Sequence, residues 1–129
     1  MIVFLSKRQV LHIHQRQIER FGGSTGVRDE GALEAALARP MATFGGEDLY
    51  PTFAEKAAAL LHSLVSNHPF LDGNKRTAAM SAELLLLVNG LEILASDQEL
   101  EELVMSTARG ERQAEEIAIW LEQRLSPLR

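Results

Sequence analysis

One stretch of the sequence, residues 78–88, is almost entirely apolar. A helix that is apolar on all sides has to be covered on all sides by the rest of the fold. We expect this helix to begin at Gly73 or Asn74 and to end at Asn89-Gly90, where glycine can adopt the left-handed conformation that closes a helix. The sequence therefore predicts a central apolar helix with the remaining chain packed around it.

The other helices are predicted from the residues that start and stop them. Ser6, Thr52 and Ser96 are each followed three residues later by Gln or Glu, which is the pattern of a capping box. The predicted helices run from about Lys7 to Phe21, from Asp29 to the Arg39-Pro40 step, from Thr52 to about Asn67, from Ser96 to about Arg109, and from Glu111 to Leu125. Two short apolar pieces, Ile2–Phe4 and Leu91–Leu94, can pair as a minor strand pair. We predict a single all-α domain over residues 1–129, a six-helix bundle.

Composition limits the classes of function. The 129 residues include no cysteine, which excludes disulfides, thiolate metal sites and cysteine nucleophiles. Lys and Arg number 13 against 18 Asp and Glu, and the net charge of −5 argues against a dedicated DNA-binding domain. No apolar run exceeds five residues, so we expect no membrane span, no export and a cytoplasmic location.

The segment 68–76, with the sequence HPFLDGNKR, differs from an ordinary helix connection. A helix N-terminus presents free backbone N–H groups and a positive dipole end, and Asn74, Lys75 and Arg76 emerge there. Such a site suits a polyphosphate. Asp72 is a hard oxygen ligand for Mg²⁺ shared with phosphate oxygens, and His68 is a base that titrates near neutral pH.

A plainer interpretation stays open when these residues are taken alone. Asp72 can be a helix N-cap, Gly73-Asn74 an ordinary turn, and Lys75 and Arg76 a solvated helix start. Basic residues in a first helical turn oppose the helix dipole, however, so their presence here favours a bound anion.

The same segment resembles the signature of the Fic/Doc superfamily, in which a histidine, a phenylalanine, an acidic residue, a small residue, an asparagine and an arginine recur in fixed order. The matching residues are His68, Phe70, Asp72, Gly73, Asn74 and Arg76. Lys75 stands where nucleotidyl-transferring Fic enzymes carry a second glycine, and Ala79 stands where they carry another arginine. Both departures resemble the death-on-curing (Doc) branch. Further likeness lies at Val10, Ile13-His14, Phe21-Gly22-Gly23, Gly26–Asp29 and Tyr50-Pro51.

This resemblance implies a toxin of a toxin–antitoxin module that transfers the γ-phosphate of ATP to a threonine of elongation factor Tu and blocks translation. By the resemblance, His68 is the catalytic base and Asp72 holds Mg²⁺. Gly73, Asn74, Lys75 and Arg76 then bind the ATP phosphates. Two alternatives remain, namely Fic-type AMP transfer to a protein hydroxyl and a non-catalytic Fic-like binding domain.

The resemblance also implies partners. A cognate antitoxin is expected to fold its C-terminal segment onto the toxin, and no inhibitory glutamate helix is recognisable within this chain. Residues Thr43–Tyr50 fall where we expect the flap that aligns the target chain beside the active loop, although an ordinary surface loop fits the residues equally well.

The remaining histidines predict no metal centre. His12 and His14 point to different faces of their helix, and His62 belongs to another element. We expect His14 to pack or to orient other groups. Arg28-Asp29 is expected to form a buried ion pair or a helix cap.

Overall fold

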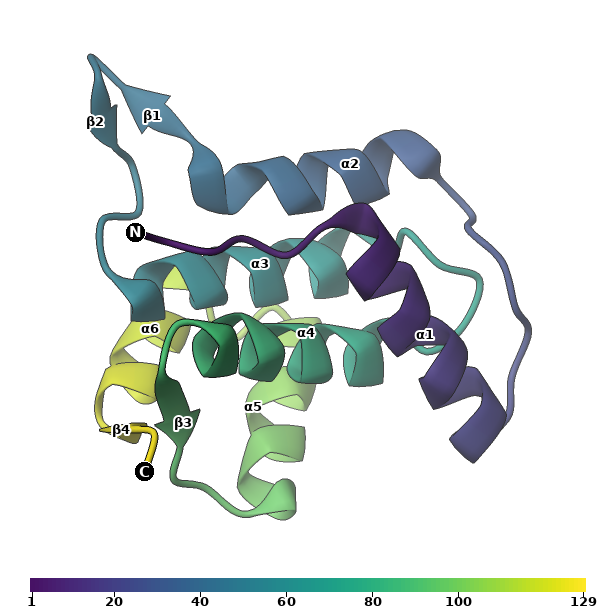
Figure 1. Cartoon of the computed structure of the whole chain (residues 1–129). Helices are drawn as coiled ribbons and strands as arrows, with labels where there is room; N and C mark the ends of the chain where they lie inside the picture. Colours follow the sequence, from purple (N-terminus) through teal and green to yellow (C-terminus); the bar gives the residue numbers. More distant parts are fainter.

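The computed structural model describes residues 1–129 and shows a mostly α-helical fold (Figure 1). Two short antiparallel strand pairs and one 3-10 turn accompany the helices. The helices are α1 (Lys7–Phe21), α2 (Glu30–Ala38), α3 (Phe53–Asn67), α4 (Asn74–Val88), α5 (Asp97–Ala108) and α6 (Ala114–Glu122), and the 3-10 turn η1 covers Arg39–Met41. None of the helices is both long and apolar enough to cross a bilayer.

Side-chain caps start the helices where the sequence predicts. Ser6 and Ser96 each accept from the backbone N–H three residues later, and both capping boxes are complete. Thr52 accepts from Glu55 N–H, and Asp29 accepts from Ala32 N–H. These bonds satisfy N–H groups that have no partner inside their helix, so four predicted helix starts are confirmed.

Helix α3, rather than α4, has neighbours on all sides. It packs against α2, η1, α4, α5 and α6, whereas α4 exposes Met80, Leu87 and Val88 on an outer face. The expectation of α4 as the central helix is therefore wrong in this respect. Alanines at positions 54, 57, 58 and 59 are fully or almost fully buried and allow neighbouring helices to approach α3 closely.

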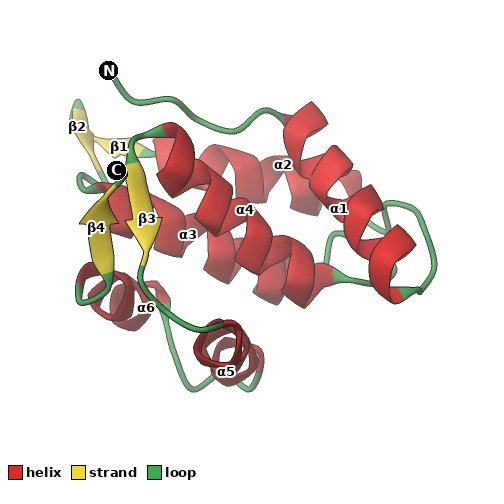
Figure 2. Cartoon of the chain, turned by 60° about the horizontal axis from the view of Figure 1, so that its bottom comes forward, coloured by secondary structure: helices red, strands yellow, loops and turns green.

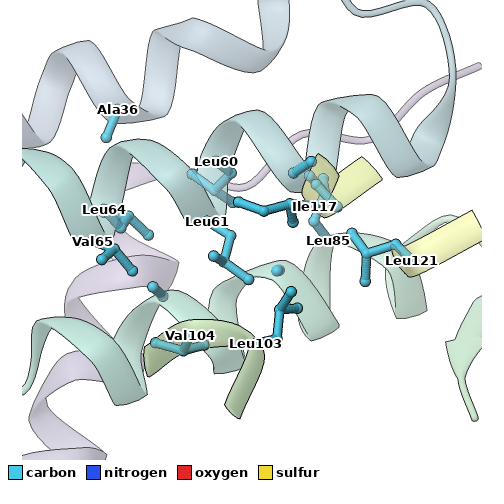
Figure 3. Close-up of a cluster of buried hydrophobic side chains, with 14 of the residues drawn as sticks. Ala36, Leu60, Leu61, Leu64, Val65, Leu85, Leu103, Val104, Ile117 and Leu121 are labelled. Carbon is cyan, nitrogen blue, oxygen red and sulfur yellow. The ribbon is translucent and has the colours of Figure 1, made fainter. Parts of the chain in front are cut away.

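The hydrophobic core forms where α3 meets α5, α6 and the inner side of α4 (Figure 3). Leu61 and Leu64 of α3, Leu103 of α5 and Ile117 and Leu121 of α6 are at most 1% exposed. Each such side chain contributes roughly 1.5–3 kcal/mol by leaving water. This core holds α3 and α4 together, the two helices that the predicted active loop connects.

The C-terminal segment differs from its prediction at both ends of α6. The helix begins only after Gln113, because Glu111 N–H donates to Ser106 O and holds that residue in the preceding turn. It ends at Glu122, and Leu125–Pro127 forms a strand, β4, that pairs with β3 (Leu91–Ile93) (Figure 2). The predicted helix 111–125 is therefore too long.

The predicted strand partner is also wrong. Residues Ile2–Phe4 belong to no strand, and β3 pairs with β4 instead. The backbone of Val3 exchanges two hydrogen bonds with the Asn89 side chain, at 2.9 and 2.8 Å. The Val3 backbone is thus bonded to a side-chain amide and not to the second strand that the apolar pattern suggests.

Candidate active site

The predicted active loop connects α3 to α4 and lies beside the connection between α1 and α2, at one end of the bundle (Figure 1). Val27 forms an antiparallel bridge with Phe70, and Leu71 N–H donates to Gly26 O at 3.2 Å. Pro69 O accepts from the backbone N–H groups of two further residues of this connection, at 2.7 and 3.1 Å. Residues 26–29 therefore support the loop backbone from Pro69 to Leu71.

His68 closes α3 in a strained conformation. Its φ of 47° makes it the one non-glycine residue with a positive φ. Arg28 holds this conformation, because its Nε donates to His68 O at 2.7 Å and its Nη2 donates to Asn67 O at 2.9 Å. Strain of this kind costs of order 1–3 kcal/mol and persists where surrounding bonds determine it, typically at functional sites. The His68 side chain is exposed.

Asp72 is fixed from two sides while its side chain stays exposed. Ser24 N–H donates to Asp72 Oδ2 at 2.8 Å, and His14 Nε2 lies 2.8 Å from Asp72 O. The carboxylate keeps Oδ1 without a protein partner, and no group of three or more His, Asp or Glu side chains gathers to hold a metal. A single carboxylate fits Mg²⁺ when phosphate oxygens and water supply the other ligands.

Asn74 has a role in the loop itself. Its Oδ1 accepts from Phe70 N–H and its Nδ2 donates to Phe70 O, both at 2.9 Å. The side-chain amide is thus bonded to the loop backbone, which leaves the second Nδ2 hydrogen and the backbone N–H of Asn74 as donors for an anion.

The N-terminus of α4 carries free donors and free cations. Gly73 is left-handed (φ 75°, ψ 17°), and no side chain caps the helix. Lys75 and Arg76 are exposed and form no ion pair, while the Arg76 guanidinium lies 4.2 Å from the centre of the Phe21 ring. The first turn of α4 therefore combines free N–H groups, the positive end of the helix dipole and two cationic residues, an arrangement suited to a polyphosphate.

The segment Thr43–Tyr50 lies elsewhere, which corrects our placement of the flap. It forms a hairpin, β1 (Thr43–Phe44) with β2 (Glu47–Asp48), beyond the far end of α2 (Figure 1). Asp48 Oδ2 accepts from Lys56 Nζ at 3.0 Å, and Lys56 precedes His68 by twelve residues (68 − 56) on α3. At 1.5 Å per residue the hairpin contact is roughly 18 Å from His68. The segment beside the loop is 23–29.

A buried lysine and several half-buried polar groups fix the segment Thr43–Tyr50 to α3. Lys56 is 1% exposed and also donates to Tyr50 O. Arg39 donates to the Tyr50 hydroxyl at 2.9 Å and to His62 Nδ1 at 2.8 Å. Burial, followed by the neighbouring Arg39 charge, lowers the pKa of His62 below its ordinary 6.5. These groups are structural and lie away from the active loop.

Residues outside the loop also support the site, a role that was not predicted from the sequence. Phe21 stacks on Arg76, and Gly23 lies against Asp72 so closely that a Cβ there would be 3.1 Å from Asp72 Cβ. Arg28 supports the His68 backbone in place of the expected ion pair, and the expected cap by Asp29 is confirmed. The supporting roles of Phe21, Gly23 and Arg28 were not predicted, because contacts across 40 or more positions leave no local pattern.

The arrangement of a helix-capping histidine, an aspartate and an uncapped helix N-terminus with an arginine matches one known class. The chain belongs to the Fic/DOC family, whose model matches residues 4–86. "Toxin Doc" of Mycolicibacterium smegmatis is 55% identical over 75 residues, which span 58% of each chain. "Protein kinase doc" of Escherichia phage P1 is 35% identical over 114 residues, which span 88% of this chain and 89% of the relative.

Proposed function

We propose that this protein is the toxin of a toxin–antitoxin module and acts as a Doc-type kinase that transfers the γ-phosphate of ATP to a protein hydroxyl. The observation that carries the proposal is that the strained, exposed His68 shares with Asp72 the loop that leads into the uncapped N-terminus of α4. The names of the two relatives, a toxin and a protein kinase, support the same activity.

His68 acts as the base. Its imidazole takes the proton of the target hydroxyl, whose oxygen forms a bond to the γ-phosphorus of ATP. The bond between that phosphorus and the oxygen bridging to the β-phosphate breaks, and ADP leaves. Phosphoryl transfer depends mainly on positioning and on neutralising charge, and the bonds from Arg28 to the end of α3 provide the positioning.

The N-terminus of α4 binds the phosphates. Backbone N–H groups from Gly73 to Arg76 and the charges of Lys75 and Arg76 stabilise the phosphate oxygens. Asp72 would hold Mg²⁺ through the carboxylate oxygen that Ser24 leaves free, and the ion, when bound, neutralises charge on the phosphates. Phe21 keeps the Arg76 guanidinium at the edge of the site.

Lys75 and Ala79 distinguish γ-phosphate transfer from AMP transfer. Lysine at position 75 fills space beside the anion site and adds a charge, and position 79 offers no second arginine. We infer that the nucleotide consequently lies with its γ-phosphate, rather than its α-phosphate, toward His68.

By family resemblance, the target is a threonine of elongation factor Tu in the cytoplasm, and translation stops when it is phosphorylated. The resemblance also supplies the partner, a cognate antitoxin whose C-terminal segment folds onto the toxin. Such coupled folding needs an apolar groove between helices.

Labelled ATP tests the chemistry. Elongation factor Tu is incubated with the protein and with ATP labelled at the α or the γ position, and we expect label only from the γ position. Transfer of α label would contradict the kinase proposal.

Growth on induction tests the toxin. We expect arrest with the native chain and with His12→Ala, an exposed histidine outside the loop, and normal growth with His68→Ala. Loss of the base lowers the rate of transfer by roughly 10²–10⁴-fold. Arrest by the His68 variant at equal expression would contradict a catalytic origin of the toxicity.

A further inference from the structure

His14 is the buried polar residue that touches the active loop. It lies on α1 and is 4% exposed, whereas His12 on the same helix is exposed. Its ring stacks on the Phe70 ring with centroids 3.8 Å apart and planes within 7°. Its Nε2 lies 2.8 Å from Asp72 O. A Cβ on Gly73 would lie 3.7 Å from His14 Cδ2, so the imidazole also fills the space beneath Gly73.

The hydrogen bond assigns the proton on the ring. A carbonyl oxygen only accepts, so His14 Nε2 must carry a hydrogen and donate it to Asp72 O. An apolar residue at this position would retain the packing against Phe70 and leave the Asp72 carbonyl without this donor. The Nε2–H donor, rather than the size of the ring, is therefore what histidine provides at position 14 and an apolar residue does not.

This bond determines which way the next N–H group points. Every peptide bond in the chain is trans, and in a trans peptide the C=O and N–H of one unit point in opposite directions. With the Asp72 carbonyl directed inward to His14, the N–H of Gly73 is directed outward. Left-handed Gly73 followed by helical Asn74 is a backbone sequence in which consecutive N–H groups form an anion-binding concavity.

We infer that His14 is a positioning residue of the anion site: its Nε2–H holds the Asp72–Gly73 peptide so that the Gly73 N–H faces the phosphate. Asp72 is then fixed through its carbonyl by His14 and through its carboxylate by Ser24. The inference rests on the proposed function for the identity of the natural ligand, ATP. The binding of an anion at this point is measurable without ATP or transfer.

Two substitutions separate the donor from the ring. His14→Phe keeps a flat ring against Phe70 and removes the donor, and His14→Gln keeps an N–H donor of similar reach and removes the ring. His12→Phe on the same helix is the matched control. All variants are first compared with the native chain by thermal unfolding.

The probe is inorganic pyrophosphate, titrated without metal and followed by calorimetry and by the backbone amide resonance of Gly73. We expect His14→Phe to weaken binding roughly tenfold, the effect of one hydrogen bond, and to reduce the shift of the Gly73 amide. We expect His14→Gln and His12→Phe to bind within about threefold of the native chain.

Equal binding by folded His14→Phe, or equal losses in His14→Phe and His14→Gln, would overturn the inference, because the ring alone would then account for the role of His14. If His14→Phe does not fold, the native chain provides the test. Pyrophosphate that shifts the Lys75 amide and leaves Gly73 unmoved would overturn it as well.

The outcomes also separate this inference from the proposed function. If the variants follow the expected order toward pyrophosphate and no label passes from ATP, the kinase proposal fails and the role of His14 stands. If label passes from the γ position and the variants bind pyrophosphate equally, the role of His14 fails alone.

Discussion

The substitution Gly23→Ala is expected to displace the Asp72 carboxylate, although residue 23 lies outside the active loop. Gly23 has a φ of 115°, and a Cβ there would be 3.1 Å from Asp72 Cβ and 3.3 Å from Asp72 Oδ2. Ordinary carbon–carbon contacts lie at about 3.5–4.0 Å, so the carboxylate has to move by several tenths of an ångström or the support from residues 23–29 has to shift.

Gly22→Ala is the matched control. Gly22 has a φ of 84°, and nothing lies within 4 Å of a Cβ built there. Both substitutions place a side chain in a conformation that favours glycine, so each is expected to lower the free energy of unfolding by about 1–3 kcal/mol. Only the substitution at Gly23 also pushes on Asp72.

The assay therefore compares two quantities in both variants. Urea titration is expected to give similar losses of stability. The rate of γ-phosphate transfer is expected to fall roughly 100-fold in Gly23→Ala and to stay within a few-fold of native in Gly22→Ala, because small misplacements of reacting groups are costly. Gly23→Ala should also need more Mg²⁺ for half-maximal rate. Equal rates and equal Mg²⁺ dependence in the two variants would refute the reasoning.

Three further predictions concern groups that stabilise the fold or the active loop. Asp48→Asn removes the negative charge beside the buried Lys56 ammonium and leaves it only neutral oxygen acceptors. Urea titration should show a loss of about 3 kcal/mol, more than for Lys56→Met; the reverse order would contradict the account. Protonation of His62 is disfavoured in the folded state, so the free energy of unfolding should fall as pH drops below the ordinary pKa of 6.5. His62→Asn retains an acceptor for Arg39 and should lack this part of the pH dependence. Parallel plots of stability against pH for the two proteins would count against the prediction. Arg28→Ala removes two bonds to the end of α3 and should lower kcat roughly tenfold or more with ATP affinity unchanged; a change in ATP affinity alone would argue for a direct phosphate contact.

The helix boundaries could be predicted because their signals are local. Ser6, Asp29, Thr52 and Ser96 each bond a backbone N–H three residues away, and a cap of that kind is visible in the sequence. The loop could be predicted for the same reason, since its residues are contiguous and the helix that follows supplies the free donors.

Features that depend on distant segments could not be predicted. The end of α6 is set by the bond from Leu94 N–H to Arg124 O, and apolar periodicity does not choose between a last helical turn and a strand. Likewise α3 is central because it packs against α2, η1, α4, α5 and α6, and contacts between distant helices leave no local pattern in the sequence.

The site likewise has features that could be predicted from local sequence and features that depend on distant segments. The sequence predicted His68, Asp72 and Asn74 as residues of the site, but not that the Asn74 side chain bonds the Phe70 backbone. The flap was expected at Thr43–Tyr50. The sequence does not show that residues 23–29 return to the loop, because those contacts join segments more than 40 positions apart.

The most direct test of the account is the intact mass of elongation factor Tu after incubation with this protein, ATP and Mg²⁺. We predict a gain equal to one phosphate group, absent with His68→Ala. A gain equal to an adenylate group would contradict the central claim that His68 directs a hydroxyl to the γ-phosphate of ATP.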